Sequence, residues 1–87
     1  MTRVIVPSQL IAYTGGATRV EATGATVDAI MHDLDRLYAG LRFRVVDEQG
    51  RIRKHMRIYV GQDRVHDLAR PLRSDDEVLI FGALSGG

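Results

Sequence analysis

One amphipathic segment, residues 26–39, most constrains how this 87-residue chain can fold. Its apolar side chains recur at spacings of three and four residues, the period of one face of an α-helix. They are Val27, Ile30, Met31, Leu34, Leu37 and Tyr38. Thr26 precedes this stripe as an N-cap, and Gly40 follows it as the residue that ends the helix. This is the one long helix that the sequence predicts.

Segments in which apolar and polar residues alternate lie on both sides of this helix, as is typical of strands half-buried in a sheet. We predict strands at 2–6, 17–22, 51–60 and 77–81, with a further short strand beginning at Arg64. The strand residues expected to face the core are Val4, Val6, Thr18, Val20, Ala22, Ile58, Val60, Val78 and Ile80.

The order of the elements, a hairpin, a helix and then further strands, predicts an α+β protein with the β-grasp (ubiquitin-like) fold. The main helix would lie on one face of a mixed sheet of four or five strands. The first and last strands, both strongly apolar, would be parallel neighbours in the middle of that sheet. A short helical turn at 41–46 would bury Leu41 and Val45, and Leu10 would cover one edge of the core. The domain would span residues 1–81, and residues 82–87 would form a flexible tail.

The composition argues against several classes of function. Twelve basic and eleven acidic residues give a formal charge of +1, which does not favour nucleic acid or a membrane surface as a partner. The chain has no cysteine, which excludes disulfides, a thioester-forming thiol and cysteine metal sites. His32, His55 and His66 lack metal-ligand spacing, so no metal site is expected. No apolar run approaches the roughly 18 residues of a membrane span, so we expect a cytoplasmic protein.

The sequence closes with Gly86-Gly87, shortly after the last predicted strand. Two glycines make a slim tail that can enter a channel too narrow for any side chain. Fully extended, residues 82–87 would reach about 20 Å beyond the sheet. The carboxylate of Gly87 would be ionised at neutral pH and would need activation before it could react as an electrophile. The chain has no GxxxxGK[ST] loop to hold ATP, so the activating chemistry would lie outside it. No Ser-His-Asp constellation can be argued from the sequence either, and we predict that the chain is not itself an enzyme.

Taken together, these features resemble the small ubiquitin-like sulfur carriers of the ThiS/MoaD superfamily, over nearly the whole chain. The likeness is greatest to the CysO-type carriers of thiocarboxylate-dependent cysteine biosynthesis. It is carried by Thr14-Gly15-Gly16, Gly24 to Thr26, Asp33-Leu34, Tyr38, Gly40, Asp47, Ile58-Tyr59-Val60, Asp76 to Ile80 and Gly86-Gly87. One departure is Gly82, since the family often has a proline near the start of the tail. A glycine there leaves the direction of the tail less fixed.

The resemblance implies a carrier protein that serves as a co-substrate of partner enzymes. An E1-like enzyme, using ATP and Mg²⁺, would adenylate the Gly87 carboxylate, and a sulfur donor would then displace AMP to leave a thiocarboxylate. Leu84, Ser85 and Gly86 would give the tail access to narrow active sites. A sulfur-accepting enzyme such as a cysteine synthase would take the sulfur. The chain itself would bind no cofactor and would be a monomer when free.

Strand alternation also predicts a binding surface for these partners. Ile5, Tyr59, Leu79 and Phe81 would point away from the helix, with Arg3 and Arg57 nearby. Aromatic residues and arginine on an exposed apolar patch are typical of protein interfaces. The alternative is that these are scattered surface residues of the kind that every protein exposes.

A basic run occupies the first part of the strand predicted at 51–60: Arg51, Arg53, Lys54, His55 and Arg57. We interpret it as a solvated strand edge, where charges discourage aggregation. The alternative is a contact with an acidic groove on a partner enzyme.

Three other functions remain open at this stage. The chain could be a ubiquitin-like modifier that is joined through Gly87 to lysines of other proteins. It could supply sulfur for molybdopterin or thiamine synthesis instead of cysteine. It could also be a β-grasp binding module in which the two terminal glycines have no chemical role. Lys54 is the sole lysine, which limits self-linked chains.

Overall fold

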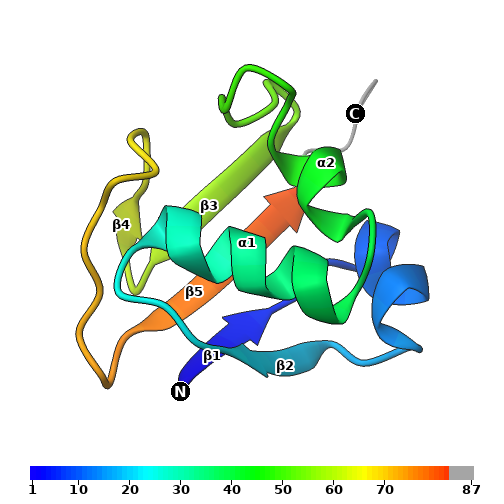
Figure 1. The fold of residues 1–87 in the computed structure, drawn as a ribbon, viewed down its shortest axis with the longest axis horizontal. Coiled ribbons are helices and arrows are strands. Elements are labelled where there is room, and N and C mark those ends of the chain that lie inside the picture. The colour runs from blue at the N-terminus through cyan, green and yellow to red at the C-terminus, as the bar shows by residue number, and fades with distance from the viewer. Residues whose placement is uncertain (83–87) are drawn as a thin grey trace.

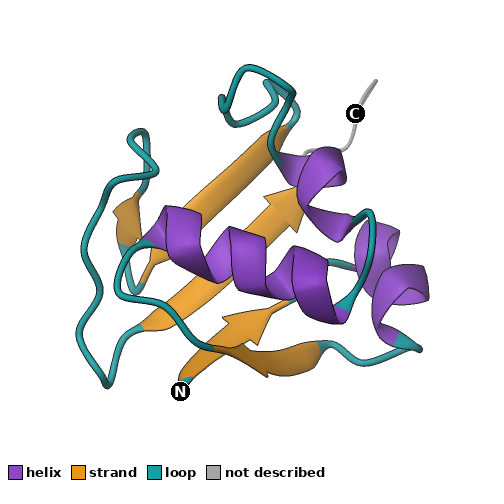
Figure 2. Cartoon of the chain, in the orientation of Figure 1, coloured by secondary structure: helices purple, strands orange, loops and turns teal. Residues whose placement is uncertain are grey.

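The computed structural model describes residues 1–82, which form a mixed five-stranded sheet with α1 lying across one face (Figures 1 and 2). The α+β, β-grasp architecture expected from the sequence is confirmed. The elements in order are β1 (Thr2–Ile5), the 3₁₀ helix η1 (Ser8–Thr14), β2 (Arg19–Ala22), α1 (Val27–Leu37), α2 (Leu41–Val45), β3 (Met56–Val60), β4 (Asp63–Arg64) and β5 (Glu77–Gly82).

The strands are arranged in the order β2-β1-β5-β3-β4. β1 and β5 run parallel, with Val4 opposite Val78, while the other neighbouring pairs are antiparallel. The first and last strands of the described chain therefore lie side by side in the middle of the sheet, as predicted (Figure 1). Residues 3–5 of β1 and residues 78–79 of β5 therefore pair with a neighbouring strand on both sides.

The start of α1 follows the predicted cap. The Thr26 hydroxyl oxygen accepts a hydrogen bond of 3.1 Å from the backbone N–H of Ala29. The end differs from the prediction, because Leu37 is 44% exposed rather than buried. The helix ends at Leu37, and Gly40 turns the chain through a left-handed φ of +93°. Leu41 of α2 then enters the core in place of Leu37.

The core lies between α1 and the sheet, and its members are the alternating strand residues together with the helix stripe. Thr18 is the exception among the predicted inward residues: it is exposed, because β2 begins only at Arg19. The buried core residues that the sequence predicted are Val4, Val6, Leu10, Val20, Ala22, Val27, Ile30, Met31, Leu34, Leu41, Val45, Ile58, Val60, Val78 and Ile80.

The strand predicted for residues 51–60 is half its expected length. Residues 51–55 form a loop in which Ile52 makes a single bridge with Val46, and β3 begins only at Met56. The backbone N–H of Arg53 bonds to the carbonyl of Val45 at the end of α2, which draws this loop away from the sheet. At the other end of the sheet, β5 includes Gly82, one residue beyond the predicted end of that strand.

Candidate partner-binding face and the exit of the chain

The sheet face opposite α1, called here the open face, carries the residues predicted to bind partners. Ile5 lies opposite Leu79, and Leu79 lies opposite Tyr59, so the three form one row across β1, β5 and β3. All three are half-buried. The row continues to Arg19 on β2 and Arg64 on β4, which stand opposite Ile5 and Tyr59. An apolar centre thus has an arginine at each edge, an arrangement that suits a protein interface.

Phe81 extends this apolar row toward the end of β5. Its side chain is 45% exposed, one of the most exposed large apolar side chains among residues 1–82. The rings of Phe81 and Tyr59 meet edge to face, with centroids 5.5 Å apart and planes at 79°. This geometry is favourable for aromatic pairs and fixes the orientation of both rings. The open face therefore presents a preformed aromatic pair.

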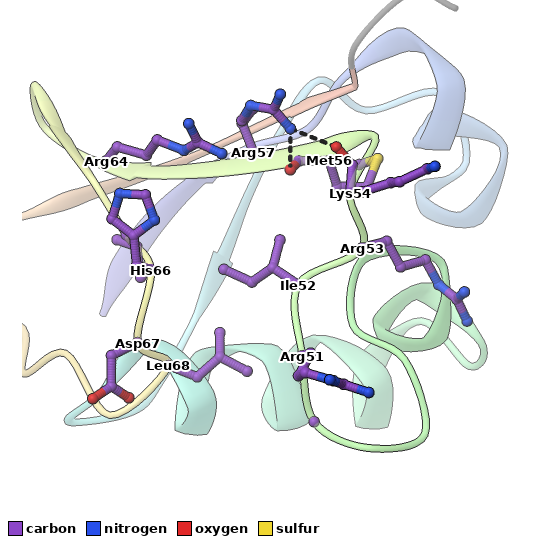
Figure 3. Close-up of a pocket in the computed structure, with 12 residues that line it drawn as sticks. Arg51, Ile52, Arg53, Lys54, Met56, Arg57, Arg64, His66, Asp67 and Leu68 are labelled. Atoms are coloured by element: carbon purple, nitrogen blue, oxygen red, sulfur yellow. Dashed lines mark hydrogen bonds between the residues drawn. The ribbon is translucent and has the colours of Figure 1, made fainter.

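Arg57 stands opposite Phe81 in the sheet register, but its guanidinium reaches sideways to the start of β3. Its Nη1 donates hydrogen bonds to the carbonyl oxygens of Lys54 (2.7 Å) and Met56 (3.0 Å), which Figure 3 shows as dashed lines. The charge of Arg57 thus lies where the open face meets the loop before β3.

The opposite end of the open face is charged rather than apolar. Arg3 stands between Glu21 and Glu77, and its Nη1 lies 3.7 Å from a Glu77 carboxylate oxygen. An exposed ion pair of this kind contributes little stability. The apolar part of the open face therefore lies toward the end of β5, where the chain leaves the sheet.

The exit of the chain is held by a contact that the sequence did not predict. Gly82 pairs with Met56 in the last register of β5, and the side-chain Nε2 of Gln9 donates a 3.2 Å hydrogen bond to the Gly82 carbonyl. The predicted tail residues Leu84, Ser85, Gly86 and Gly87 lie outside the described residues.

Sequence reasoning placed Ile5, Arg57, Tyr59, Leu79 and Phe81 on the correct face, and their role in binding stays a prediction. It missed three contributors: Gln9, Arg19 and Arg64. Only the strand order shows that Arg19 and Arg64 end the same row. Nothing in the sequence links Gln9 to Gly82, which are 73 residues apart.

Most of the predicted basic run, residues 51–55, lies in the loop before β3 rather than along a strand edge, and Arg57 lies within β3. With the segment that follows β4, this loop encloses a groove of about 540 Å³, called here the basic groove (Figure 3). It is lined by Gly50, Arg51, Ile52, Arg53, Lys54, Met56, Arg57, Arg64, Val65, His66, Asp67 and Leu68.

Two aspartates, Asp33 and Asp47, have lowered pKa values because they accept hydrogen bonds within the fold, and neither belongs to the open face. The backbone N–H of Thr23, together with Arg36, holds the pKa of Asp33 below its ordinary value of 3.8. The backbone N–H of Arg51 does the same for the pKa of Asp47.

Across residues 1–82, no three potential ligand side chains gather into a metal site. In the same part of the chain, no helix is long and apolar enough to cross a membrane.

Residues 4–87 match the model of the ThiS family. The chain belongs to the ThiS family. The family assignment therefore extends over the sheet, the open face and the predicted tail residues through Gly87.

Two relatives in this family carry the same name. Sulfur carrier protein CysO of Mycobacterium tuberculosis is 34% identical over 89 aligned residues, covering 97% of this chain and 96% of that protein. Its crystal structure superimposes with a TM-score of 0.91 at 31% identity, over 97% of this chain and all of that one. A chain in the crystal structure of the Amycolatopsis orientalis BexX/CysO complex is 32% identical, with a TM-score of 0.92 and full coverage of both chains.

A more distant structure shares the fold alone. The crystal structure of SAMP1 from Haloferax volcanii superimposes with a TM-score of 0.78 at 24% identity, over 99% of this chain and 98% of that one.

Proposed function

We propose that this ThiS-family chain is a sulfur carrier that transports sulfur as a thiocarboxylate on Gly87. The observation that carries the proposal is the similarity to CysO sulfur carrier proteins along 97% of the chain, within a family match that runs through Gly87. The chain is a co-substrate of its partners and not an enzyme. Its most fitting destination is cysteine biosynthesis, with a cysteine synthase as the sulfur-accepting enzyme.

The chemistry takes place on the partner that activates the chain, an E1-like enzyme that binds ATP and Mg²⁺. A carboxylate oxygen of Gly87 attacks the α-phosphorus of ATP, and pyrophosphate leaves to give an acyl-adenylate. Sulfide from a donor then attacks the carbonyl carbon and expels AMP, which leaves the thiocarboxylate. The need for ATP favours the cytoplasm as the site of both steps. Because the chain has no cysteine, no thiol of its own can capture the adenylate as a thioester.

The structure supports separate roles for the folded domain, which would dock on the partner, and for the C-terminal tail, which would react. The open face offers a half-buried apolar row, an aromatic pair and flanking arginines at the end of the sheet that leads to residue 83. A partner that docks on this face would therefore hold the body beside its own active-site channel. Holding the carboxylate in line with the α-phosphate in this way lowers the barrier by reducing the entropy lost on reaction.

The absence of cysteine also makes a direct test possible. The purified chain is incubated with the E1-like enzyme of the same organism, ATP, Mg²⁺ and sulfide, and the product is treated with iodoacetamide. We expect ATP-dependent alkylation at the C-terminus, because the thiocarboxylate would be the only thiol-like group in the chain. Alkylation is the better readout, since oxidation of any of the three methionines changes the intact mass by nearly the same amount as sulfur replacing oxygen.

The control is the chain without Gly87, which should remain unlabelled under identical conditions. Linkage of the chain to lysines of other proteins, with no alkylated product, would instead identify a modifier. If ATP and the activating enzyme leave the chain unchanged, the sulfur carrier proposal is wrong. Transfer of sulfur from the labelled carrier into cysteine, rather than into molybdopterin or thiamine precursors, tests the proposed destination.

A further inference from the structure

The basic groove concentrates positive charge in a nearly neutral molecule. Of twelve basic residues in the chain, five line this groove, together with His66 and a single acid, Asp67. The formal charge of the whole chain is only +1, so the remainder of the chain carries net negative charge. The five are Arg51, Arg53, Lys54, Arg57 and Arg64.

These five cations have little internal compensation. Within residues 1–82, no ion pair joins any of them to a carboxylate, although salt bridges occur elsewhere on the surface. The carboxylate of Asp67 accepts a hydrogen bond from the backbone N–H of Ala69, two residues along the same turn. Asp47, outside the groove, feels the charges of Arg51 and Arg53 but is held mainly by backbone N–H groups. The groove therefore offers unneutralised positive charge to a ligand.

The floor of the groove is apolar. Met56, Val65 and Leu68 are buried side chains of the core, and Ile52 packs against that core while remaining partly exposed. Figure 3 shows Ile52 and Leu68 at the middle of the groove, with the basic side chains around it. A matching ligand would thus place an apolar group in the centre and anionic groups toward the rim.

Two of the basic side chains, Arg53 and Arg57, are bonded to different parts of the backbone, and their separation indicates which kind of anion the groove can bind. The Nε of Arg53 donates to the Phe43 carbonyl (2.8 Å), and its guanidinium lies 4.5 Å from the centre of the Phe43 ring. Arg57 is bound to two carbonyls at the start of β3. Since the charges do not converge on one point, a single phosphate is poorly matched, and a segment carrying several carboxylates is well matched.

Nucleic acid fits the groove less well than an acidic polypeptide does. No Phe, Tyr or Trp side chain lines the groove, so bases would have no stacking platform. The net negative charge on the rest of the chain would also repel a long polyanion. A short acidic segment of a protein avoids this repulsion because its charge is local.

The position of the groove connects it with the end of the sheet. Met56 lines the groove and also pairs with Gly82, and Arg57 belongs both to the groove and to the row that contains Phe81. A protein bound on the open face could therefore extend into the groove without a break.

We propose that the basic groove binds an acidic segment, with an apolar side chain among its carboxylates, of the enzyme that activates Gly87. This inference rests on the proposed function and identifies a second contact surface for the same partner. Rim charges of this kind chiefly raise the association rate and make it sensitive to salt.

The test compares two charge-reversed double variants. Arg51→Glu with Lys54→Glu alters the groove, whereas Arg44→Glu with Arg73→Glu makes the same change in net charge on α2 and in the loop before β5, away from the groove. We measure pyrophosphate release by the E1-like enzyme over a range of carrier concentrations. The groove variant should lose about tenfold in kcat/KM at low salt, with kcat at saturation retained. The loss should shrink as salt rises, and the control should stay within about twofold of wild type.

Equal behaviour of the two double variants would overturn the proposal while leaving the sulfur carrier function intact. Failure of the wild-type chain to be activated would overturn both. If the groove variant is unfolded by circular dichroism, Arg51→Gln with Lys54→Gln replaces it, with the same ordering expected. Tight binding of inorganic phosphate or of a single-stranded oligonucleotide in the groove, at the salt concentration of the assay, would also contradict an acidic protein segment as occupant.

A crosslink provides independent evidence, because Lys54 is the only lysine in the chain. A carbodiimide should join Lys54 to an aspartate or glutamate of the activating enzyme, and peptide mass spectrometry should locate the bond. Lys54→Arg keeps the charge, so it should lose the crosslink but retain activation. A crosslink that forms only through the N-terminal amine of the chain would place the enzyme's acids elsewhere and contradict the proposal.

Discussion

The side-chain amide of Gln9 donates a hydrogen bond of 3.2 Å to the carbonyl oxygen of Gly82. Through it, the 3₁₀ helix η1 near the start of the chain holds the last described residue of β5. A Cβ added at Gly82 would clash with the side-chain amide of Gln9, so a larger residue there must displace this side chain. The two residues thus act as one unit at the exit of the chain.

This contact predicts non-additive effects of substitution. Gln9→Ala should cost about 0.5–1 kcal/mol, because it removes one exposed hydrogen bond. Gly82→Ala breaks the same bond by pushing the Gln9 side chain aside, so adding it in the Gln9→Ala background should cost less than adding it to wild type. Urea unfolding of the four proteins measures the coupling. Strictly additive free energies would show that the side chain of Gln9 does not hold Gly82.

The core could be predicted from sequence because its signal is local. Alternation in β1, β3 and β5 assigns Val4, Ile58 and Ile80 to the covered face, whatever the strand order. Alternation also assigned the open-face residues, since each strand has only two faces. The helix stripe was correct apart from Leu37: Tyr38 packs against the core, whereas Leu37 is exposed, and Leu41 is buried after the chain turns at Gly40.

The features that sequence could not supply depend on contacts between distant segments. Arg51-Ile52-Arg53 alternates as a strand would, but the Arg53 side chain bonds to Phe43 and the loop folds into the wall of the basic groove. The row from Arg19 to Arg64 exists only once the order of five strands is known. Strand register and contacts at the sheet edge cannot be predicted from patterns among neighbouring residues in the sequence.

Gly24 is predicted to be a position that accepts no side chain. A Cβ there would lie 2.7–2.8 Å from Cβ and backbone atoms of Ala29 and from the backbone N of Ile30, at the start of α1. Backbone atoms of a capped helix cannot move aside cheaply, so Gly24→Ala should lower the free energy of unfolding by about 1–3 kcal/mol or more. Chemical denaturation measures the change.

The matched control for that substitution is Gly50→Ala. At Gly50 a Cβ would meet no atom within 4 Å, but the backbone has a left-handed φ of +79°. Only the conformational cost of about 1–2 kcal/mol should appear. Both substitutions lower the free energy of unfolding, but only Gly24→Ala adds a steric clash, and a second substitution tests the origin of that clash. Ala29→Gly should not restore the Gly24→Ala variant, because the backbone contacts remain. Full rescue would contradict a backbone clash.

Asp33 should make stability dependent on acid pH. Its pKa in the folded protein lies below the ordinary value of 3.8, chiefly because the N–H of Thr23 donates a 2.8 Å hydrogen bond to it, with Arg36 adding a second contact. A lowered folded-state pKa stabilises the fold above the ordinary pKa, and this contribution is lost as pH falls through the folded value. Asp33→Asn should therefore be less stable than wild type at neutral pH, and the difference should vanish in strong acid. A difference that is unchanged by pH would contradict a role for the charge.

Phe81 provides the sharpest test of the open face. Its ring is 45% exposed, so Phe81→Ala should cost only about 1 kcal/mol of stability, largely from its edge-to-face contact with Tyr59. If the face docks the activating enzyme, the same change removes a central aromatic anchor and should raise KM for activation by roughly tenfold or more. The pyrophosphate-release assay measures this, with kcat expected to change little because the reacting carboxyl group is untouched.

The control variant is Leu37→Ala, which removes an equally exposed apolar side chain (44%) from α1 on the other side of the sheet. It should leave KM within about twofold of wild type, since an exposed side chain outside an interface contributes nothing to binding. Unfolding curves of both variants show whether a change in KM follows from a change in stability. An equal rise in KM for both variants would show that the effect is not specific to the open face. If Phe81→Ala does not raise KM, the open face is not part of the interface.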